Sequence, residues 1–186
     1  MTAQDLLARL VEALKRAGIQ YMLTGSMASS MHGLPRASND IDFVIAPTVE
    51  QLRSLKSLLP ESEYYFDLDD ALESLKRRQQ FNVLDLSGCW KIDLIIQKSR
   101  PFSITEFDRR VEVDVQGLRL HTATAEDVVL AKLEWAKIGA SKRQIEDAAG
   151  ILKIRSAELD RNYIEHWVQD LALQEQWLDA LRIAGP

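Results

Sequence analysis

The chain has 186 residues, of which 46% are hydrophobic and 27% are charged, and its formal net charge is −5. This length fits one domain, or one domain with a small helical extension, and the composition is that of a globular rather than a disordered protein. The negative charge argues against a protein that coats nucleic acid through bulk positive charge.

Membrane and secretory signals are not expected in this sequence. No apolar run reaches the roughly 18–20 residues that a membrane span needs, and the first residues lack the pattern of a signal peptide. The single cysteine, Cys89, excludes an intramolecular disulfide and fits a reducing cytoplasm. It lies beside Trp90 in an apolar run and is expected to pack there.

Helices and strands are predicted to alternate over the first two thirds of the chain. Apolar positions at helical spacing predict helices over residues 3–17, 26–31, 48–59, 70–78 and 102–109. Short apolar runs between turn residues predict strands over residues 19–24, 40–45, 64–66, 81–86, 90–96, 111–115 and 118–120. Asp69 is the expected N-terminal cap of the fourth helix.

The last third of the chain is helical in pattern throughout. Helices are predicted over residues 125–138, 141–154, 157–171 and 174–183, the first of them introduced by Thr124 and Asp127. We therefore divide the chain into a mixed α/β region, residues 1–121, and a helical region, residues 122–186, which is expected to pack on the sheet. The tryptophans of this helical region are expected to lie in its core; they are Trp135, Trp167 and Trp177.

The stretch from Gly25 to Ile45 begins with a turn that is suited to an anion. Gly25 and Ser26 follow a predicted strand and open a short helix of small residues. In that arrangement free backbone N–H groups and the helix dipole hold phosphate, Gly25 permits close backbone approach, and Ser26 adds a hydroxyl. The alternative is that Ser26 caps the helix and binds no ligand.

The same stretch ends with two aspartates, Asp40 and Asp42. Because side chains alternate along a strand, both carboxylates point to one face, where they repel each other unless a cation neutralises them. Mg²⁺ prefers such oxygen ligands, although carboxylates at a strand end are also often simply solvated. Asp93, on a very apolar strand, would complete a triad if its strand lies beside that of Asp42. Asp85 is the competitor, and Asp93 is preferred because its flanking residues mirror those of Asp42.

Together these motifs resemble the nucleotidyltransferase superfamily shared with DNA polymerase beta. The motifs that carry the resemblance are Gly25-Ser26, then Asp40-Ile41-Asp42 after thirteen residues, then Asp93. The fuller pattern, with His32-Gly33 and Pro35-Arg36 before Asp40, is similar to the bacterial AbiEii/AbiGii-type nucleotidyltransferases, some of which are toxins of toxin–antitoxin systems. The resemblance covers roughly residues 5–155. It implies an α+β nucleotidyltransferase fold, in which a mixed sheet flanked by helices precedes a C-terminal helical bundle.

The resemblance implies further site residues. A lysine on the helix after the sheet and an acidic residue on the next helix correspond to Lys132 and Asp147. Lys132 lies among apolar residues, where it needs a partner such as a triphosphate or Asp147, unless it extends to the surface. Gln144 departs from the family pattern, which often has an acidic residue there. Arg36 is implied either to contact phosphate or base, or to link to the aspartate strand; His32 is expected to be a packed helix-end residue.

The implied activity is transfer of a nucleoside monophosphate from an NTP to a hydroxyl of RNA (tRNA) or protein, with Mg²⁺ or else Mn²⁺. The implied metal ligands are Asp40, Asp42 and Asp93; Gly25, Ser26, Arg36 and Lys132 would bind the nucleotide. Lys132 and Asp147 would join the three aspartates as catalytic residues, with Asp93 as a metal ligand or general base. The implied partners are an NTP, the acceptor and a cognate antitoxin or toxin, in the cytoplasm and without a membrane.

Two other functions stay open at this point. One is a non-catalytic nucleotide-binding antitoxin or regulatory module, against which the intact set of three aspartates argues. The other is an unrelated metal phosphatase or hydrolase that uses the same carboxylates. A zinc enzyme is not favoured, because the three histidines, His32, His121 and His166, have no ligand spacing.

Overall fold

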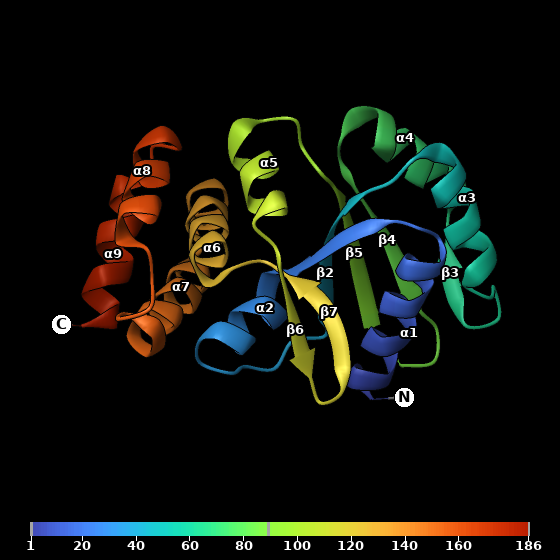
Figure 1. Ribbon diagram of the computed structural model, residues 1–186, viewed down its shortest axis with the longest axis horizontal. Coiled ribbons are helices and arrows are strands. Elements are labelled where there is room, and N and C mark those ends of the chain that lie inside the picture. Colours follow the sequence, from blue (N-terminus) through green and yellow to red (C-terminus); the bar gives the residue numbers. More distant parts are fainter. Residues whose placement is uncertain (1, 89, 186) are drawn as a thin grey trace. The chain divides into compact units, whose positions relative to one another are not determined.

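The computed structural model describes residues 2–88 and 90–185 of the chain. Cys89, for which packing in an apolar run was predicted, lies outside the described residues. The chain forms two compact units, each made from two segments (Figure 1). The first unit comprises Met1–Leu23 and Ser38–Thr122, and the second comprises Thr24–Ala37 and Ala123–Pro186.

The first unit is built on a mixed sheet. Within the described residues this sheet has seven strands in the order β3-β4-β5-β2-β1-β7-β6. The strands are β1 Gln20–Thr24, β2 Asp40–Ala46, β3 Tyr64–Phe66, β4 Gln80–Asp85, β5 Trp90–Ile96, β6 Val111–Val115 and β7 Leu118–Thr122. Strands β2 and β5 are parallel neighbours, and so are β1 and β7, whereas β3, β4 and β5 pair antiparallel, as do β6 and β7. Every predicted strand is present, with boundaries within two residues.

Four helices of the first unit follow from apolar spacing and local caps. They are α1 Ala3–Arg16, α3 Val49–Leu58, α4 Leu68–Arg77 and α5 Pro101–Asp108. Thr2 and Thr48 each form a capping box, at the starts of α1 and α3. The prediction that Asp69 caps the fourth helix is wrong. Asp67 is the cap, because its carboxylate accepts from the backbone N–H groups of Asp69 and Asp70, so the helix starts earlier.

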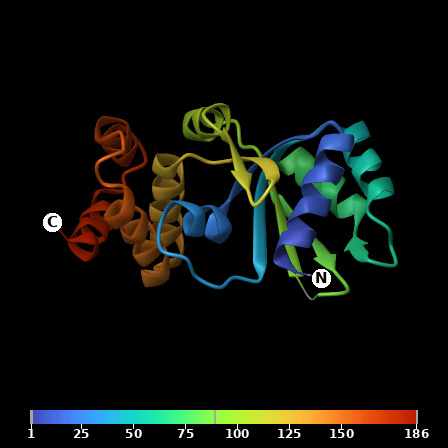
Figure 2. The same ribbon diagram turned by 60° about the horizontal axis from the view of Figure 1, so that its bottom comes forward.

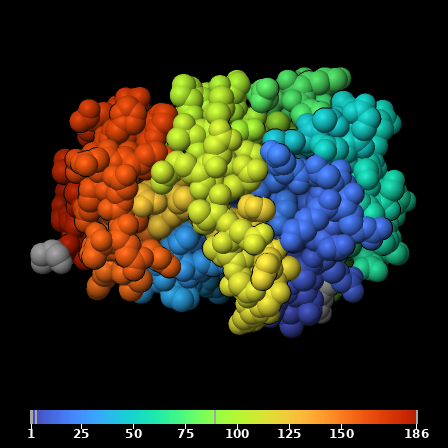
Figure 3. All heavy atoms as spheres, viewed as in Figure 1, coloured from blue at the N-terminus to red at the C-terminus, as the bar shows by residue number. Residues whose placement is uncertain are grey.

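Side-chain alternation gives this sheet two different faces. The residues paired across β2, β5 and β4 at one level are Ile41, Ile92 and Val83, and all three are fully buried. We call their side the helix face, because α1 and α3 lie side by side across it (Figures 1 and 2). The polar outer side of α1 is exposed to solvent (blue in Figure 3). The opposite side, which carries Asp42 and Asp93, we call the carboxylate face.

The second unit consists of helices. They are α2 Gly25–His32, α6 Ala125–Gly139, α7 Lys142–Arg155, α8 Arg161–Asp170 and α9 Gln174–Ala184. Helix α2 packs on α6 and α7, and α9 packs mainly on α7. The helix predicted over residues 157–171 begins only at Arg161, where Asp160 caps it by accepting from the backbone of Tyr163. Within the described ranges, no helix has the length and apolar character that a membrane crossing requires.

The tryptophan prediction for this unit is correct for two of the three residues. Trp167 and Trp177 are 8% and 6% exposed and belong to the core. Trp135, on α6, is 51% exposed, so the prediction is wrong for this residue.

Candidate active site

Two aspartates on neighbouring strands form the centre of the acidic cluster. Strands β2 and β5 run parallel with Asp42 opposite Asp93 and Asp40 opposite Lys91. Residues paired in this way point to the same side of a sheet, so all four side chains lie on the carboxylate face. The prediction that the Asp93 strand lies beside the Asp42 strand is therefore confirmed. Their catalytic roles stay predictions.

Asp85, the alternative third carboxylate, belongs to the other side of the sheet. It pairs with Trp90, one residue before Lys91, and therefore points to the helix face. It is 1% exposed, and its carboxylate accepts from the backbone N–H groups of Ser87 and Gly88. These contacts stabilise the turn between β4 and β5, which accounts for a buried carboxylate there.

A lysine that the sequence reasoning missed lies among the carboxylates. Lys91 Nζ donates to Asp93 Oδ2 over 2.9 Å. This hydrogen bond and the negative charges of Asp93 and the two β2 aspartates raise the pKa of Lys91, although partial burial opposes them. The signal was available, because residues two apart on a strand share a face and Lys91 precedes Asp93 by two.

The donor chemistry of this cluster fits a hard divalent cation such as Mg²⁺, which prefers carboxylate oxygens. Asp93 is 7% exposed, and its Oδ1 atom is buried without a hydrogen-bond partner. A buried oxygen of this kind is available to ligate a cation. Over residues 2–88 and 90–185, however, no group of three or more His, Cys, Asp or Glu side chains is arranged to hold a metal ion. The other oxygen of Asp93 is instead bound to the Lys91 ammonium.

The predicted phosphate-binding turn lies in the second unit. Gly25 has a φ of +64°, a conformation that favours glycine, and it begins α2. The alternative in which Ser26 caps this helix is wrong, because the N-cap residue is Thr24 and Ser26 lies inside the first turn. The Ser26 hydroxyl accepts a hydrogen bond from the Arg36 guanidinium.

Arg36 and Lys132 are joined through Asp147. Arg36 Nε donates to Asp147 Oδ1 over 2.9 Å, and Lys132 Nζ donates to Asp147 Oδ2 over 2.7 Å. The side chains of Lys132 and Asp147 are only 5% and 9% exposed. Burial alone would raise the pKa of Asp147, but hydrogen bonds and charges from Arg36 and Lys132 lower it below its ordinary value. The partner that Lys132 was expected to need is thus Asp147 in this structure.

We define the cation network as Ser26, Arg36, Lys132 and Asp147, in which two cationic side chains contact one carboxylate. Cationic side chains at a helix N-terminus are suited to phosphate, because backbone N–H groups and the helix dipole add to the side-chain charge. Its nucleotide-binding role stays a prediction.

His32 has a structural role in the second unit. It ends α2, and its Nε2 atom donates to the backbone carbonyl of Ala123 over 2.8 Å. Burial lowers the pKa of His32, which favours the neutral ring that this packing requires. These features agree with the expectation that it is a packed helix-end residue.

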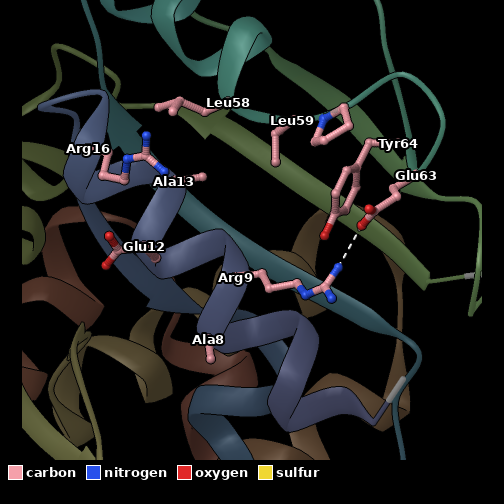
Figure 4. A pocket seen from close by; sticks show the side chains of 10 residues that line it. Ala8, Arg9, Glu12, Ala13, Arg16, Leu58, Leu59, Glu63 and Tyr64 are labelled. Atoms are coloured by element: carbon pink, nitrogen blue, oxygen red, sulfur yellow. Dashed lines mark hydrogen bonds and ion pairs between the residues drawn. The ribbon is translucent and has the colours of Figure 1, made fainter.

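A pocket of about 510 Å³ lies in the first unit between α1 and the segment that leads from α3 into β3 (Figure 4). An ion pair between Arg9 and Glu63, 2.6 Å long, crosses it close to Tyr64. Tyr64 pairs with Asp85 and therefore belongs to the helix face. This pocket is thus separated from the carboxylates by the sheet.

Comparison with known proteins identifies the fold but not a family. No family model matches the chain, and no curated protein matches it either. Its structure is similar to ANT(2")-Ia in complex with adenylyl-2"-tobramycin, with a TM-score of 0.61, 13% identity, and coverage of 94% of this chain and 99% of that one. It is also similar to an antigenic nucleotidyltransferase-like protein from Paracoccidioides brasiliensis, with a TM-score of 0.59, 14% identity, and coverage of 97% and 92%. A third similar structure is that of a putative nucleotidyltransferase from Thermotoga maritima, with a TM-score of 0.51, 14% identity, and coverage of 77% of this chain and 92% of that one. The chain therefore has the nucleotidyltransferase fold, as its sequence motifs predicted.

Proposed function

We propose that this protein is a Mg²⁺-dependent nucleotidyltransferase, which transfers a nucleoside monophosphate from an NTP to a hydroxyl group. The observation that carries the proposal is the pairing of Asp42 with Asp93 on parallel strands, with Asp40 on the same face. Carboxylate oxygens on one face are the kind of ligand that the ion accompanying a triphosphate prefers. The nucleotidyltransferase fold supports the same reaction class.

The reaction is an in-line displacement. The acceptor oxygen bonds to the α-phosphorus, the bond from that phosphorus to the bridging oxygen breaks, and pyrophosphate leaves. Asp93 would accept the hydroxyl proton or ligate the metal, and Asp40 and Asp42 would hold the metal. When bound, Mg²⁺ supplies charge neutralisation at the phosphate oxygens. Gly25, Ser26, Arg36 and Lys132 bind phosphates of the NTP, and Asp147 holds the two cationic side chains in position.

We propose an RNA (tRNA) or protein hydroxyl as the acceptor, in a toxin-type component that has a cognate partner. The resemblance to the toxin-containing families supports this assignment, whereas the net charge of −5 speaks against a large RNA footprint. The structural neighbour bound to adenylyl-2"-tobramycin supports a test of small hydroxylated molecules as well.

A second candidate is a non-catalytic nucleotide-binding module, such as an antitoxin or a regulator. Two contacts favour it: Lys91 occupies an oxygen of Asp93, and Asp147 engages both Arg36 and Lys132. Such internal ion pairs neutralise charges that a substrate would otherwise meet.

The test incubates the protein and Mg²⁺ with each α-labelled NTP and, in turn, with total tRNA, cell extract or tobramycin. The proposal predicts label in one acceptor fraction, together with release of pyrophosphate. Asp42→Asn should abolish the labelling, whereas Asp69→Asn, on the exposed first turn of α4, should not. Nucleotide binding without any labelling would support the second candidate, and release of phosphate without pyrophosphate would indicate a hydrolase.

A further inference from the structure

Helix α2 ends at a glycine that lies directly against the backbone of α7. A Cβ atom on Gly33 would lie 2.8 Å from the backbone N of Ile151 and 2.9 Å from the backbone C of Gly150. A real Cβ atom essentially never comes this close, and a backbone atom, unlike the end of a flexible side chain, cannot turn away. Only glycine therefore permits this approach of the two elements.

The chain around Gly33 runs along α7 in the opposite direction. The carbonyl of His32 accepts from Arg155 Nε over 3.1 Å, and Arg36 Nε donates to Asp147 Oδ1 over 2.9 Å. As the residue numbers rise from 32 to 36, the partners on α7 fall from 155 to 147, and the contact of Gly33 lies between these two ends. The contact of Gly33 thus sets how near this segment lies to α7.

The position of Arg36 depends on this distance. Its guanidinium donates to Asp147 on α7 and to the Ser26 hydroxyl on α2, so it has to stay within hydrogen-bond reach of both. Arg36 follows Gly33 by three residues, and Pro35 restricts its own φ and the conformation of the residue before it. Such a short and restricted connection passes a displacement at Gly33 on to Arg36.

We propose that Gly33 is a positioning residue of the cation network: because it has no side chain, the segment after α2 lies directly on α7, and this contact places Arg36 between Asp147 and Ser26, where it can bind phosphate. The inference rests on the proposed function for the role of Arg36 toward the phosphates of an NTP. The placement of Arg36 is nevertheless a property of the protein without ligand, and it can be measured without turnover.

The first test follows the Nε–Hε group of Arg36 by ¹⁵N NMR in the protein without ligand. In the wild type this group is hydrogen-bonded to Asp147, and its signal is identified by its absence from Arg36→Lys. Gly33→Ala should shift the signal toward that of solvent-exposed arginines and speed the exchange of its proton with water. Gly139→Ala is the matched control and should leave the signal unchanged, because a Cβ atom there has no neighbour within 4 Å.

Substitutions of Gly150 perturb the same contact from α7, and they decide the question if Gly33→Ala does not fold. A Cβ atom on Gly150 would meet Leu34 at 3.5 Å, an ordinary van der Waals distance, so Gly150→Ala should leave the Arg36 signal unchanged. Gly150→Leu adds three further carbon atoms at this point and should displace the exposed Leu34, and with it Arg36, by less than Gly33→Ala does. An Arg36 signal that stays at its wild-type position in every folded variant of these two glycines would overturn the inference.

The phosphate role is measured by isothermal titration calorimetry with pyrophosphate, which offers phosphate groups without a base. Gly33→Ala should weaken binding about tenfold, the scale of one misplaced charge-assisted hydrogen bond, and Gly139→Ala should not. In an Arg36→Met background, Gly33→Ala should have no further effect on the affinity, because a positioning residue acts through the residue that it positions. A further tenfold loss in that background would show that Gly33 supports the fold in general, and would overturn the inference.

These measurements also separate the inference from the proposed function. A displaced Arg36 signal in Gly33→Ala, with no pyrophosphate binding and no nucleotide transfer by the wild type, would remove the proposed function and leave Gly33 as the residue that places Arg36. Undiminished nucleotide transfer together with an unchanged Arg36 signal in Gly33→Ala would do the reverse.

Discussion

In the first unit one ammonium lies among three carboxylates, whereas in the second unit one carboxylate lies between two cations. The single opposite charge in each cluster, Lys91 in one and Asp147 in the other, also differs in its exposure to solvent. The Lys91 side chain is 42% exposed, but that of Asp147 is only 9% exposed and its partner Lys132 is 5% exposed. Water can replace part of the stabilisation that the Lys91 ammonium gives the carboxylates. Water can replace less of what Asp147 provides, because Asp147 and its partner Lys132 are both nearly buried.

Because of this difference, we expect substitutions in the two clusters to affect activity and stability differently. The carboxylate cluster is expected to be important for activity and nearly neutral for stability. The cation network is expected to be important for both. Substitutions in the two clusters test that contrast.

Asp93→Asn should reduce the nucleotidyl-transfer rate by about 10³-fold, the scale of losing one electrostatic group that acts on the transition state. The free energy of unfolding should change by about 1 kcal/mol or less, because the remaining partner, Lys91, is half exposed to water. The rate comes from the labelled-NTP assay and the stability from urea unfolding. A loss of stability as large as the loss of activity would show that Asp93 is a structural residue.

Asp147→Ala should lower the free energy of unfolding by about 3 kcal/mol, the cost of removing one partner from a largely buried ion pair. Urea unfolding followed by circular dichroism measures this. Glu146→Ala is the matched control, because Glu146 is the exposed neighbour on the same helix; it should change stability by less than about 0.5 kcal/mol. Equal effects of the two substitutions would contradict the structural role of Asp147.

Lys132→Met should lower the transfer rate by about 10²-fold while changing the free energy of unfolding by about 1 kcal/mol or less. Asp147 keeps its hydrogen bonds from Arg36, and methionine fills a similar volume among apolar neighbours. Lys142→Met, at an exposed position at the start of α7, should leave the rate unchanged. If Lys132→Met were as destabilising as Asp147→Ala, the two cations would not share the carboxylate.

The contribution of Asp147 should also depend on pH. Its pKa is lower in the folded protein than its ordinary value of 3.8, so the folded state binds fewer protons at this group than the unfolded state. The stabilisation is therefore complete above about pH 5 and is lost as pH falls through the lowered pKa. The stability difference between wild type and Asp147→Asn, measured by urea unfolding at several pH values, should be constant near neutrality and shrink in acid. A difference that grows in acid would reverse the sign and contradict the pairing.

The sequence predicted most of the fold because its signals are local. Alternating and helical apolar spacing located every strand and helix of the described residues, and Gly25 and Thr124 marked two helix starts. Errors arose where several capping residues compete, as at Asp67 and Asp69, and where a polar turn at residues 156–160 carries helix-compatible residues.

The contacts within each cluster were harder to predict, because they depend on strand order and on helix packing. Only the pairing of β2 with β5 shows that Lys91 lies opposite Asp40, and only the packing of α6 on α7 joins Lys132 to Asp147. Asp93 and not Asp85 lies on the same face as Asp42, a difference that follows from register. Spacing along the chain does not determine such register.

The second unit has one further consequence for protein engineering. Its helix α2 comes from residues between β1 and β2, yet it packs on α6 and α7. A fragment that starts at residue 123 would lack α2 and Arg36, and a fragment that ends at residue 122 would carry α2 without the helices on which it packs. In a split-protein reporter cut between residues 122 and 123, α2 of the first fragment would therefore pack on α6 and α7 of the second when the two reassemble. A self-contained helical module would need residues 24–37 grafted onto its N-terminus.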